Sequence, residues 1–128
     1  MRVIIAGSRS LREYGIVVRA MSDLVREMHL SQDALNKIEI VSGACPTGAD
    51  ALGERFALRN NLSLKKFPAD WGKYGKAGGP IRNRQMAEYA AADHGILMAF
   101  WDGKSRGTAS MIREANAHWL TVRIIKIS

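Results

Sequence analysis

The stretch Val3-Ile4-Ile5-Ala6-Gly7-Ser8-Arg9 opens the chain with four apolar residues that run directly into a glycine turn. A second stretch, residues 96–108, repeats this order, because the apolar run Ile-Leu-Met-Ala-Phe-Trp precedes a turn that contains Gly103 and Gly107. Short apolar runs that end in turns are typical of strands buried on both faces. We expect each turn to open a helix, so the two stretches together predict an α/β domain.

Strand and helix patterns alternate along the rest of the chain. The expected strands are residues 2–6, 38–42, 62–67, 95–101 and 122–127, and the third is polar enough for a sheet edge. Apolar residues between the strands follow helical spacing, as in Val17, Ala20, Met21, Leu24 and Met28; Ala49, Leu52 and Phe56; Met86 and Ala90; and Thr108, Ile112, Ala115 and Trp119. An irregular loop is expected over residues 68–79, with Pro80 in the first turn of the following helix. This alternation predicts a single Rossmann-like domain, residues 1–128, with an open parallel sheet of five strands in the order 3-2-1-4-5 and helices on both faces.

The composition is strongly basic. Lysine and arginine number 19 against 12 acidic residues, which gives a formal net charge of +7. Such an excess favours anionic partners, namely nucleotides, nucleic acids or acidic surfaces. The plainer interpretation is a basic surface that keeps the protein soluble, and the sequence leaves both open.

Several classes of protein are not expected. No apolar run approaches the roughly 20 residues that span a bilayer, and the chain begins on a predicted strand rather than a signal peptide. A single cysteine, Cys45, forms no intramolecular disulfide, which indicates a reducing, cytoplasmic compartment. The histidines lack metal-ligand spacing, and neither a Walker motif nor a dinucleotide fingerprint is present, so we expect no metal and no cofactor.

The two glycine turns carry the first candidate site. Glycine lets backbone amides approach a ligand closely, and a helix N-terminus offers unpaired amides and a partial positive charge. Both turns follow strands that end at one edge of the sheet, where parallel α/β domains bind ligands. This combination suits a phosphate group. The expected ligand-binding residues here are Gly7, Ser8, Arg9, Asp102, Gly103, Ser105, Gly107 and Thr108, with the phosphate on the backbone of residues 103–108.

A basic segment after the third strand carries the second candidate site. Trp71 lies in the Gly/Pro-rich loop, and Arg82 and Asn83 are expected in the first turn of the next helix. Cations in a first turn oppose the helix dipole, and a bound anion offsets that conflict. Arg82 is therefore the expected counter-charge of the phosphate, although a solvated basic face is the simpler alternative. Trp71 either stacks on a base or sugar, or covers the core as loop tryptophans often do.

The turn after the second strand adds Ser42, Gly43 and Asp50 to the expected ligand-binding residues. Ser42 and Gly43 end the strand, and Asp50 falls in the first turn of the next helix. Asp50 either caps that helix or accepts a hydrogen bond from a ribose hydroxyl. Cys45, in the same turn, has no evident base nearby and is interpreted as a small buried thiol.

These segments together resemble one superfamily. The segments Gly7-Ser8-Arg9, Ser42-Gly43 with Gly48-Ala49-Asp50, Pro68-Ala69-Asp70-Trp71, Arg82-Asn83-x-x-Met86 and Phe100–Thr108 occur in this order. The chain resembles the SLOG superfamily, which joins the Smf/DprA proteins to the Lonely Guy phosphoribohydrolases, and within it the small YspA-like branch related to YpsA. The resemblance spans nearly the whole chain. It implies a Rossmann-like domain that binds nucleotides or nucleotide-derived ligands.

One position separates this chain from the enzymatic branch. Lonely Guy enzymes use the Arg of an Arg-Lys-x-x-Met motif and the Glu of Pro-Gly-Gly-x-Gly-Thr-x-x-Glu. Arg82 matches the first motif and Gly107-Thr108 match the second, but the Glu position holds Met111. Cleavage of an N-glycosidic bond needs a carboxylate beside the oxocarbenium-like transition state, and methionine has none. The candidate catalytic residues are therefore Arg82 and, as an alternative carboxylate, Asp50, and this activity is disfavoured.

The sequence thus predicts a domain that binds or senses a nucleotide or a nucleotide-derived phosphorylated ligand. The first alternative is a nucleotide N-glycosidase that uses another carboxylate, and the second is nucleic-acid binding, as in the DprA relatives. No membrane partner is expected. A homodimer or higher homo-oligomer is expected, because Met86, Met111 and Trp119 belong to helices that pair between subunits in Lonely Guy relatives. Packing of Met111 within its own subunit is the alternative.

Overall fold

The computed structural model describes residues 1–128 and contains one sheet of five parallel strands, in the order β3-β2-β1-β4-β5. The strands are β1 (Arg2–Gly7), β2 (Glu39–Ser42), β3 (Ser63–Lys66), β4 (Gly95–Trp101) and β5 (Thr121–Lys126). The helices are α1 (Tyr14–Glu27), α2 (Gln32–Asn36), α3 (Gly48–Arg59), α4 (Trp71–Tyr74), the 3-10 helix η1 (Gly75–Ala77), α5 (Gly78–Ala91) and α6 (Arg106–Ala117). The predicted fold class and strand order are confirmed. None of these helices is both long and apolar enough to cross a membrane.

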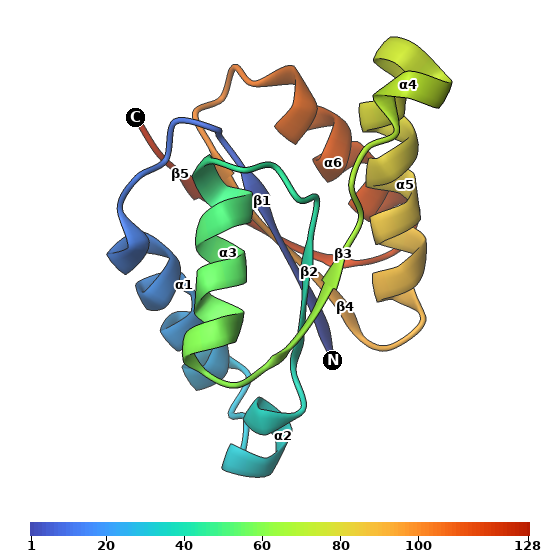
Figure 1. Cartoon of the computed structure of the whole chain (residues 1–128). Helices are drawn as coiled ribbons and strands as arrows, with labels where there is room; N and C mark the ends of the chain where they lie inside the picture. The colour runs from blue at the N-terminus through green and yellow to red at the C-terminus, as the bar shows by residue number, and fades with distance from the viewer.

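Alternation along the strands divides the core into two layers. Val3 and Ile5 of β1 pack with residues of α1 and α3, whereas Ile4 and Ala6 pack with residues of α5 and α6. Successive side chains of a strand point to opposite faces, so a strand covered on both faces is apolar throughout. Figure 1 shows the two pairs of helices on opposite sides of the sheet.

The loops that follow the strands gather at the carboxyl edge of the sheet, at the top of Figure 1. β1 and β4 are neighbours in the sheet, yet β1 leads to α1 on one face and β4 leads to α6 on the other. The reversal of direction between two adjacent strands leaves a crevice at their carboxyl ends, which is the usual ligand position in open parallel sheets. The turns at Gly7 and at residues 102–108 lie at this one edge, as predicted.

Three helix boundaries differ from the prediction. α1 begins only at Tyr14, so the Gly7 turn does not open a helix directly. α5 begins at Gly78, before Pro80, and Arg82 therefore lies in its second turn rather than its first. α6 ends at Ala117 because the Leu120 amide bonds to the Ala115 carbonyl at 3.0 Å, which closes the helix. Trp119 consequently lies outside α6, with φ of 63° and 93% of its surface exposed.

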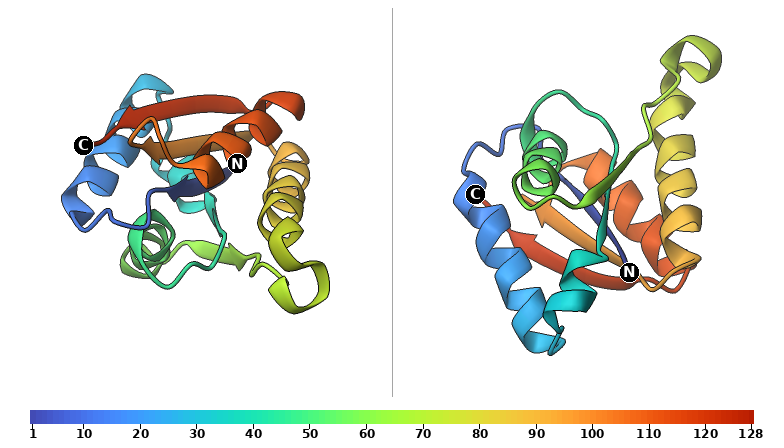
Figure 2. Two further views of the ribbon diagram at one scale, coloured as in Figure 1. Left: turned by 90° about the horizontal axis from the view of Figure 1, so that it is seen from above. Right: turned by 60° about the horizontal axis from the view of Figure 1, so that its bottom comes forward.

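Two short helices are not predicted from the sequence. In α2 the Ser31 side chain accepts a hydrogen bond from the Ala34 amide at 3.1 Å, and in α4 the Asp70 side chain accepts one from the Lys73 amide at 3.0 Å. Each of these helices is stabilised by a capping side chain. Their segments lack the apolar periodicity from which a helix is predicted. The predicted irregular loop is thus largely helical, because α4 and η1 run into α5. Figure 2 shows α4 projecting beyond the body of the domain.

Candidate functional site

A cavity of about 420 Å³, here called the inner cavity, lies at the carboxyl ends of β1 and β4, beside the second turn of α5 and the first turn of α6. Residues from four segments line it: Ala6, Gly7, Ser8, Arg9 and Ser10; Cys45 and Asp50; Arg82, Asn83 and Met86; and Ser105, Gly107, Thr108 and Met111. Its volume is in the range of about 300–1,000 Å³ that is usual for small-molecule sites. Most of the predicted ligand-binding residues meet here. Ser42, Gly43, Trp71, Asp102 and Gly103 do not line this cavity.

Arg82 is a firmly held cation of the inner cavity. Its Nη1 atom donates a hydrogen bond to the Gly43 carbonyl at 2.5 Å, and its Nε atom donates one to Oδ1 of Asn83 at 3.0 Å. The Nη2 atom has no acceptor in the protein, and no buried side-chain nitrogen or oxygen is left unpaired, so Nη2 stays accessible. The guanidinium is therefore fixed on one side and free to donate on the other. Burial lowers the pKa of Arg82, and nearby Asp50 opposes this effect.

Asn83 joins α5 to α6. Its side chain is buried, and its Nδ2 atom donates hydrogen bonds to Oγ of Ser110 at 3.2 Å and to the Gly107 carbonyl at 3.4 Å. Its Oδ1 atom accepts the hydrogen bond from Arg82. The side chain of Asn83 is thus directed toward protein groups, and it orients both Arg82 and the first turn of α6.

Asp50 is the only acidic residue that lines the inner cavity, and only 9% of its surface is exposed. Its Oδ2 atom accepts a hydrogen bond from the Cys45 amide at 3.1 Å. Burial raises the pKa of Asp50 to about 6, against the opposing effects of this hydrogen bond and of the charge on Arg82. A carboxyl group with this pKa exchanges a proton close to neutral pH, as general acids and bases do.

Gly43 gives Arg82 and Asp50 the space to approach each other. A methyl group at Gly43 would lie 2.7 Å from Nη1 of Arg82 and 2.9 Å from Oδ2 of Asp50. Both distances are shorter than carbon atoms keep in proteins, so either side chain would have to move. The guanidinium of Arg82 and the carboxyl group of Asp50 therefore both approach Gly43, because this residue has no side chain.

The N-terminus of α6 supplies backbone donors to the inner cavity. Ser105 caps this 12-residue helix, because its Oγ atom accepts from the Thr108 amide at 3.4 Å and its carbonyl accepts from the Ala109 amide at 3.1 Å. The amides of Arg106 and Gly107 have no carbonyl within the helix to bond. Gly107 lines the cavity, so its amide, with the helix dipole, offers a donor to an anion there.

Asp102 and Gly103 shape the turn before α6 without lining the cavity. The Oδ1 atom of Asp102 accepts hydrogen bonds from the amides of Lys104 at 2.8 Å and Ser105 at 2.9 Å, and these bonds hold the pKa of Asp102 below its usual range. Gly103 has a φ of 83°, a left-handed conformation that glycine adopts without strain. Both residues therefore have an evident structural role.

Ser42 is also removed from the cavity. It is fully buried, donates a hydrogen bond to Oε2 of Glu54 at 2.7 Å and accepts one from the Ala44 amide at 3.0 Å. These bonds fix the turn between β2 and α3. Ser42 is thus expected to support Gly43 and Asp50 rather than to touch a ligand.

A smaller cavity of about 250 Å³, here called the outer cavity, adjoins the inner one. Arg9, Cys45 and Arg82 line both cavities. The remaining lining residues are Gly43, Ala44, Pro46, Pro68, Ala69 and Trp71. Gly43 and Trp71 do not line the inner cavity. They border the outer cavity, which shares Arg9 and Arg82 with the inner one.

Five residues that line the inner cavity were not among the predicted ligand-binding residues: Ala6, Ser10, Cys45, Met86 and Met111. Cys45, interpreted from the sequence as buried, is half-buried and lines both cavities. Met86 and Met111, each 1% exposed, give the inner cavity an apolar surface and pack into the core of their own subunit. Met111 lies one turn after Gly107 on α6, and this helical spacing is the signal that places it in the cavity.

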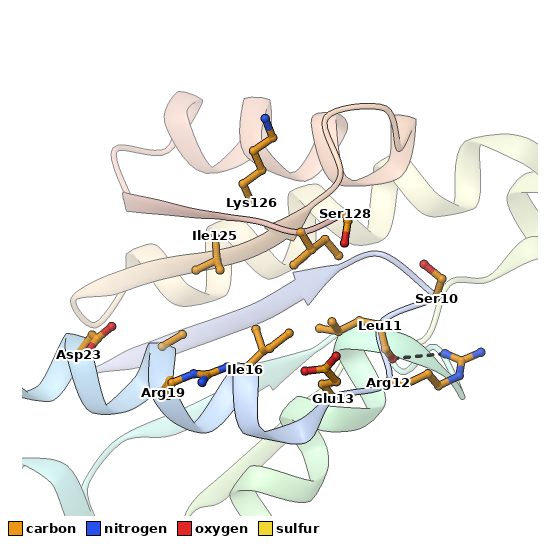
Figure 3. Close-up of a pocket in the computed structure, with 12 residues that line it drawn as sticks. Ser10, Leu11, Arg12, Glu13, Ile16, Arg19, Asp23, Ile125, Lys126 and Ser128 are labelled. Atoms are coloured by element: carbon orange, nitrogen blue, oxygen red, sulfur yellow. Dashed lines mark hydrogen bonds between the residues drawn. The ribbon is translucent and has the colours of Figure 1, made fainter.

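A larger hollow of about 600 Å³ lies elsewhere, between α1 and β5. Figure 3 shows charged side chains of both signs along it, including Arg12, Glu13 and Asp23, with a hydrogen bond from Arg12 to the Leu11 carbonyl. None of the predicted ligand-binding residues lines it. No group of three or more histidine, cysteine, aspartate or glutamate side chains in the structure is placed to hold a metal ion.

The sheet and the two cavities define a Rossmann-like domain with a polar site at its switch point. The chain belongs to the YspA, cpYpsA-related SLOG family, whose sequence model matches residues 1–74. It is also 36% identical over 119 residues to the gene 61 protein of Mycobacterium phage D29, an alignment that covers 89% of this chain and 87% of that protein. No solved structure gives a significant match.

Proposed function

We propose that the inner cavity binds a nucleotide or a nucleotide-derived phosphorylated ligand. One observation carries this proposal: the partly free guanidinium of Arg82 lines the same cavity as Gly107, whose amide in the first turn of α6 has no carbonyl partner within the helix. A guanidinium and a helix N-terminus are two common partners of phosphate in proteins. Membership of the SLOG family supports a nucleotide-related ligand.

Arg9 adds a second cation to this site. It is exposed, and its guanidinium makes no ion pair or hydrogen bond within the protein. The cavity therefore carries two arginines against the single carboxyl group of Asp50. An anionic ligand corrects this imbalance, since it supplies the acceptors that Arg9 and Arg82 lack.

Binding is tested by thermal denaturation with a panel of nucleoside monophosphates, followed by calorimetric titration of those that stabilise the protein. A ligand that binds only the folded state raises its stability by mass action, by about 2.7 kcal/mol at 100 times the Kd. Chromatography of the same mixtures shows whether the nucleotide is recovered intact. We expect stabilisation without turnover. A protein that no nucleotide or ribose 5-phosphate stabilises contradicts the proposal.

Asp50 favours a second candidate, nucleotide N-glycosidase activity. It is the one carboxyl group in the inner cavity, and its pKa of about 6 suits proton transfer near neutral pH. Release of free base from a nucleoside monophosphate, abolished by Asp50→Asn, is the result that would support this candidate over simple binding.

We also propose a homo-oligomer and a cytoplasmic location. Burial of Met86 and Met111 within one subunit removes them as contacts between subunits. Trp119, with 93% of its surface exposed, is the remaining candidate among the three residues expected at such a contact. Light scattering at micromolar concentration tests assembly, and a strict monomer contradicts it. The cytoplasmic location rests on the single unpaired Cys45.

A further inference from the structure

Trp71 lies against the N-terminus of α5, where two glycines make room for it. A methyl group at Gly79 would lie 3.1 Å from Cη2 of Trp71, and one at Gly78 would lie 3.2 Å from Cε3. The six-membered ring of the indole therefore packs closely on the backbone of this helix end. The Asp70 side chain accepts a hydrogen bond from the Lys73 amide and so caps the short helix that carries Trp71. The contact with Gly78 and Gly79 and the cap from Asp70 together hold the indole in place.

Trp71 is nevertheless half exposed, with 51% of its surface accessible, and it belongs to neither core cluster. It does not cover the core, because α4 projects beyond the body of the domain (Figure 2). Instead it borders the outer cavity together with Arg9 and Arg82. An indole fixed on one side and open on the other has the form of a stacking surface.

We propose that Trp71 is the platform on which the base of the nucleotide stacks, with the base in the outer cavity and the phosphate in the inner one. This inference rests on the proposed function, since it assumes that the inner cavity holds the phosphate. Arg9, Cys45 and Arg82 line both cavities, so the ligand passes from one to the other along a shared wall. The ribose then lies beside Arg82 and Cys45.

The outer cavity recognises an aromatic base without reading its identity. Apart from the two arginines and Cys45, it is lined by glycine, alanine, proline and Trp71, and it contains no carboxylate or amide side chain. Stacking tolerates every base because every base has a π-face. The four common nucleoside monophosphates should therefore bind with similar affinity, whereas ribose 5-phosphate, which lacks a base, should bind more weakly.

Calorimetric titration with AMP and with ribose 5-phosphate tests the platform. In Trp71→Ala we expect the Kd for AMP to rise about 5- to 150-fold, the effect of losing one stacked base, while the Kd for ribose 5-phosphate stays within about twofold. Trp71→Phe keeps an aromatic face and should retain most of the AMP affinity. We also expect AMP to quench tryptophan fluorescence in the unmodified protein, and Trp71→Phe should remove this quenching.

Two further variants separate stacking from general damage. Gly79→Ala keeps every ring but requires the indole to shift by a few tenths of an ångström, so it should weaken AMP binding less than Trp71→Ala does and leave ribose 5-phosphate binding unchanged. Tyr74→Ala removes an exposed aromatic ring of the same short helix that lines neither cavity, and it should change neither affinity. Unchanged AMP affinity in Trp71→Ala, or equal loss of both ligands, overturns the platform alone. Failure of both ligands to bind the unmodified protein overturns the proposed function and the platform with it.

Discussion

Arg82 reaches from the second turn of α5 to the turn after β2, where its Nη1 atom donates a 2.5 Å hydrogen bond to the carbonyl of Gly43. The two residues are 39 positions apart, so this bond joins the two halves of the chain across the carboxyl edge of the sheet. It leaves Nη2 free and holds the guanidinium beside the buried carboxyl group of Asp50. The predictions below depend on this arrangement.

Replacement of Arg82 by alanine should weaken nucleotide binding about 10- to 150-fold, the equivalent of about 1.5–3 kcal/mol for hydrogen bonds to a charged group. Calorimetric titration measures the change, and circular dichroism confirms that the variant is folded. Arg84→Ala is the matched control, because Arg84 lies on the same helix, is exposed and pairs only with Glu88 at 3.8 Å. Equal affinity of Arg82→Ala and the unmodified protein would identify Arg82 as a surface cation only.

Gly43→Ala should reduce nucleotide affinity while leaving the fold intact. The added methyl group would lie 2.7 Å from Nη1 of Arg82, so the guanidinium must leave its position. Gly43 does not have a positive φ, so alanine causes no backbone strain there. Gly15→Ala in α1 is the control, since nothing lies within 4 Å of its added methyl group. Alanine should stabilise that helix by about 0.5–1 kcal/mol. If both variants bind the nucleotide normally, the close approach of Arg82 and Asp50 at Gly43 does not contribute to binding.

Asp50→Asn should stabilise the protein at pH 8 more than at pH 4. The folded pKa of Asp50 is about 6, above the ordinary 3.8, so the unmodified protein loses stability as the pH rises from about 4 to 6. Asparagine does not ionise, so the gain in the free energy of unfolding at pH 8 should exceed that at pH 4 by roughly 2–3 kcal/mol. Urea denaturation at both pH values measures it. A gain that is equal at the two pH values would contradict the burial effect.

The unmodified protein should release no measurable base from AMP, because Met111 lies where Lonely Guy relatives carry glutamate. Met111→Glu places a carboxyl group in the cavity that Arg82 also lines, and weak hydrolysis is then expected. Chromatographic detection of adenine gives the rate. Met111→Gln has the same shape without the negative charge and should be inactive. Rapid release of adenine by the unmodified protein would instead favour the Asp50 alternative.

The sequence by itself determined the order of the strands and the edge of the sheet that carries the site. Apolar runs such as residues 3–6 mark strands buried on both faces, and strand–helix alternation leaves few topologies for a parallel sheet. Gly7 ends β1, and Ser105, Gly107 and Thr108 lie within seven residues of the end of β4, so their position at the carboxyl edge follows from topology alone. These features depend on local spacing, which is readable in a single chain.

Only the tertiary structure decided which side chains meet at that edge and which are already engaged by protein. The sequence predicts Asn83 and Ser42 as ligand contacts, and only the structure shows that their side chains form hydrogen bonds with Ser110, Gly107, Glu54 and Ala44, while Asn83 also lines the inner cavity. Trp71 borders the outer cavity because Gly78 and Gly79 leave room for it to pack on α5. Burial raises the pKa of Asp50. Hydrogen-bond partners and desolvation arise from groups distant along the chain, and local periodicity carries no information about them.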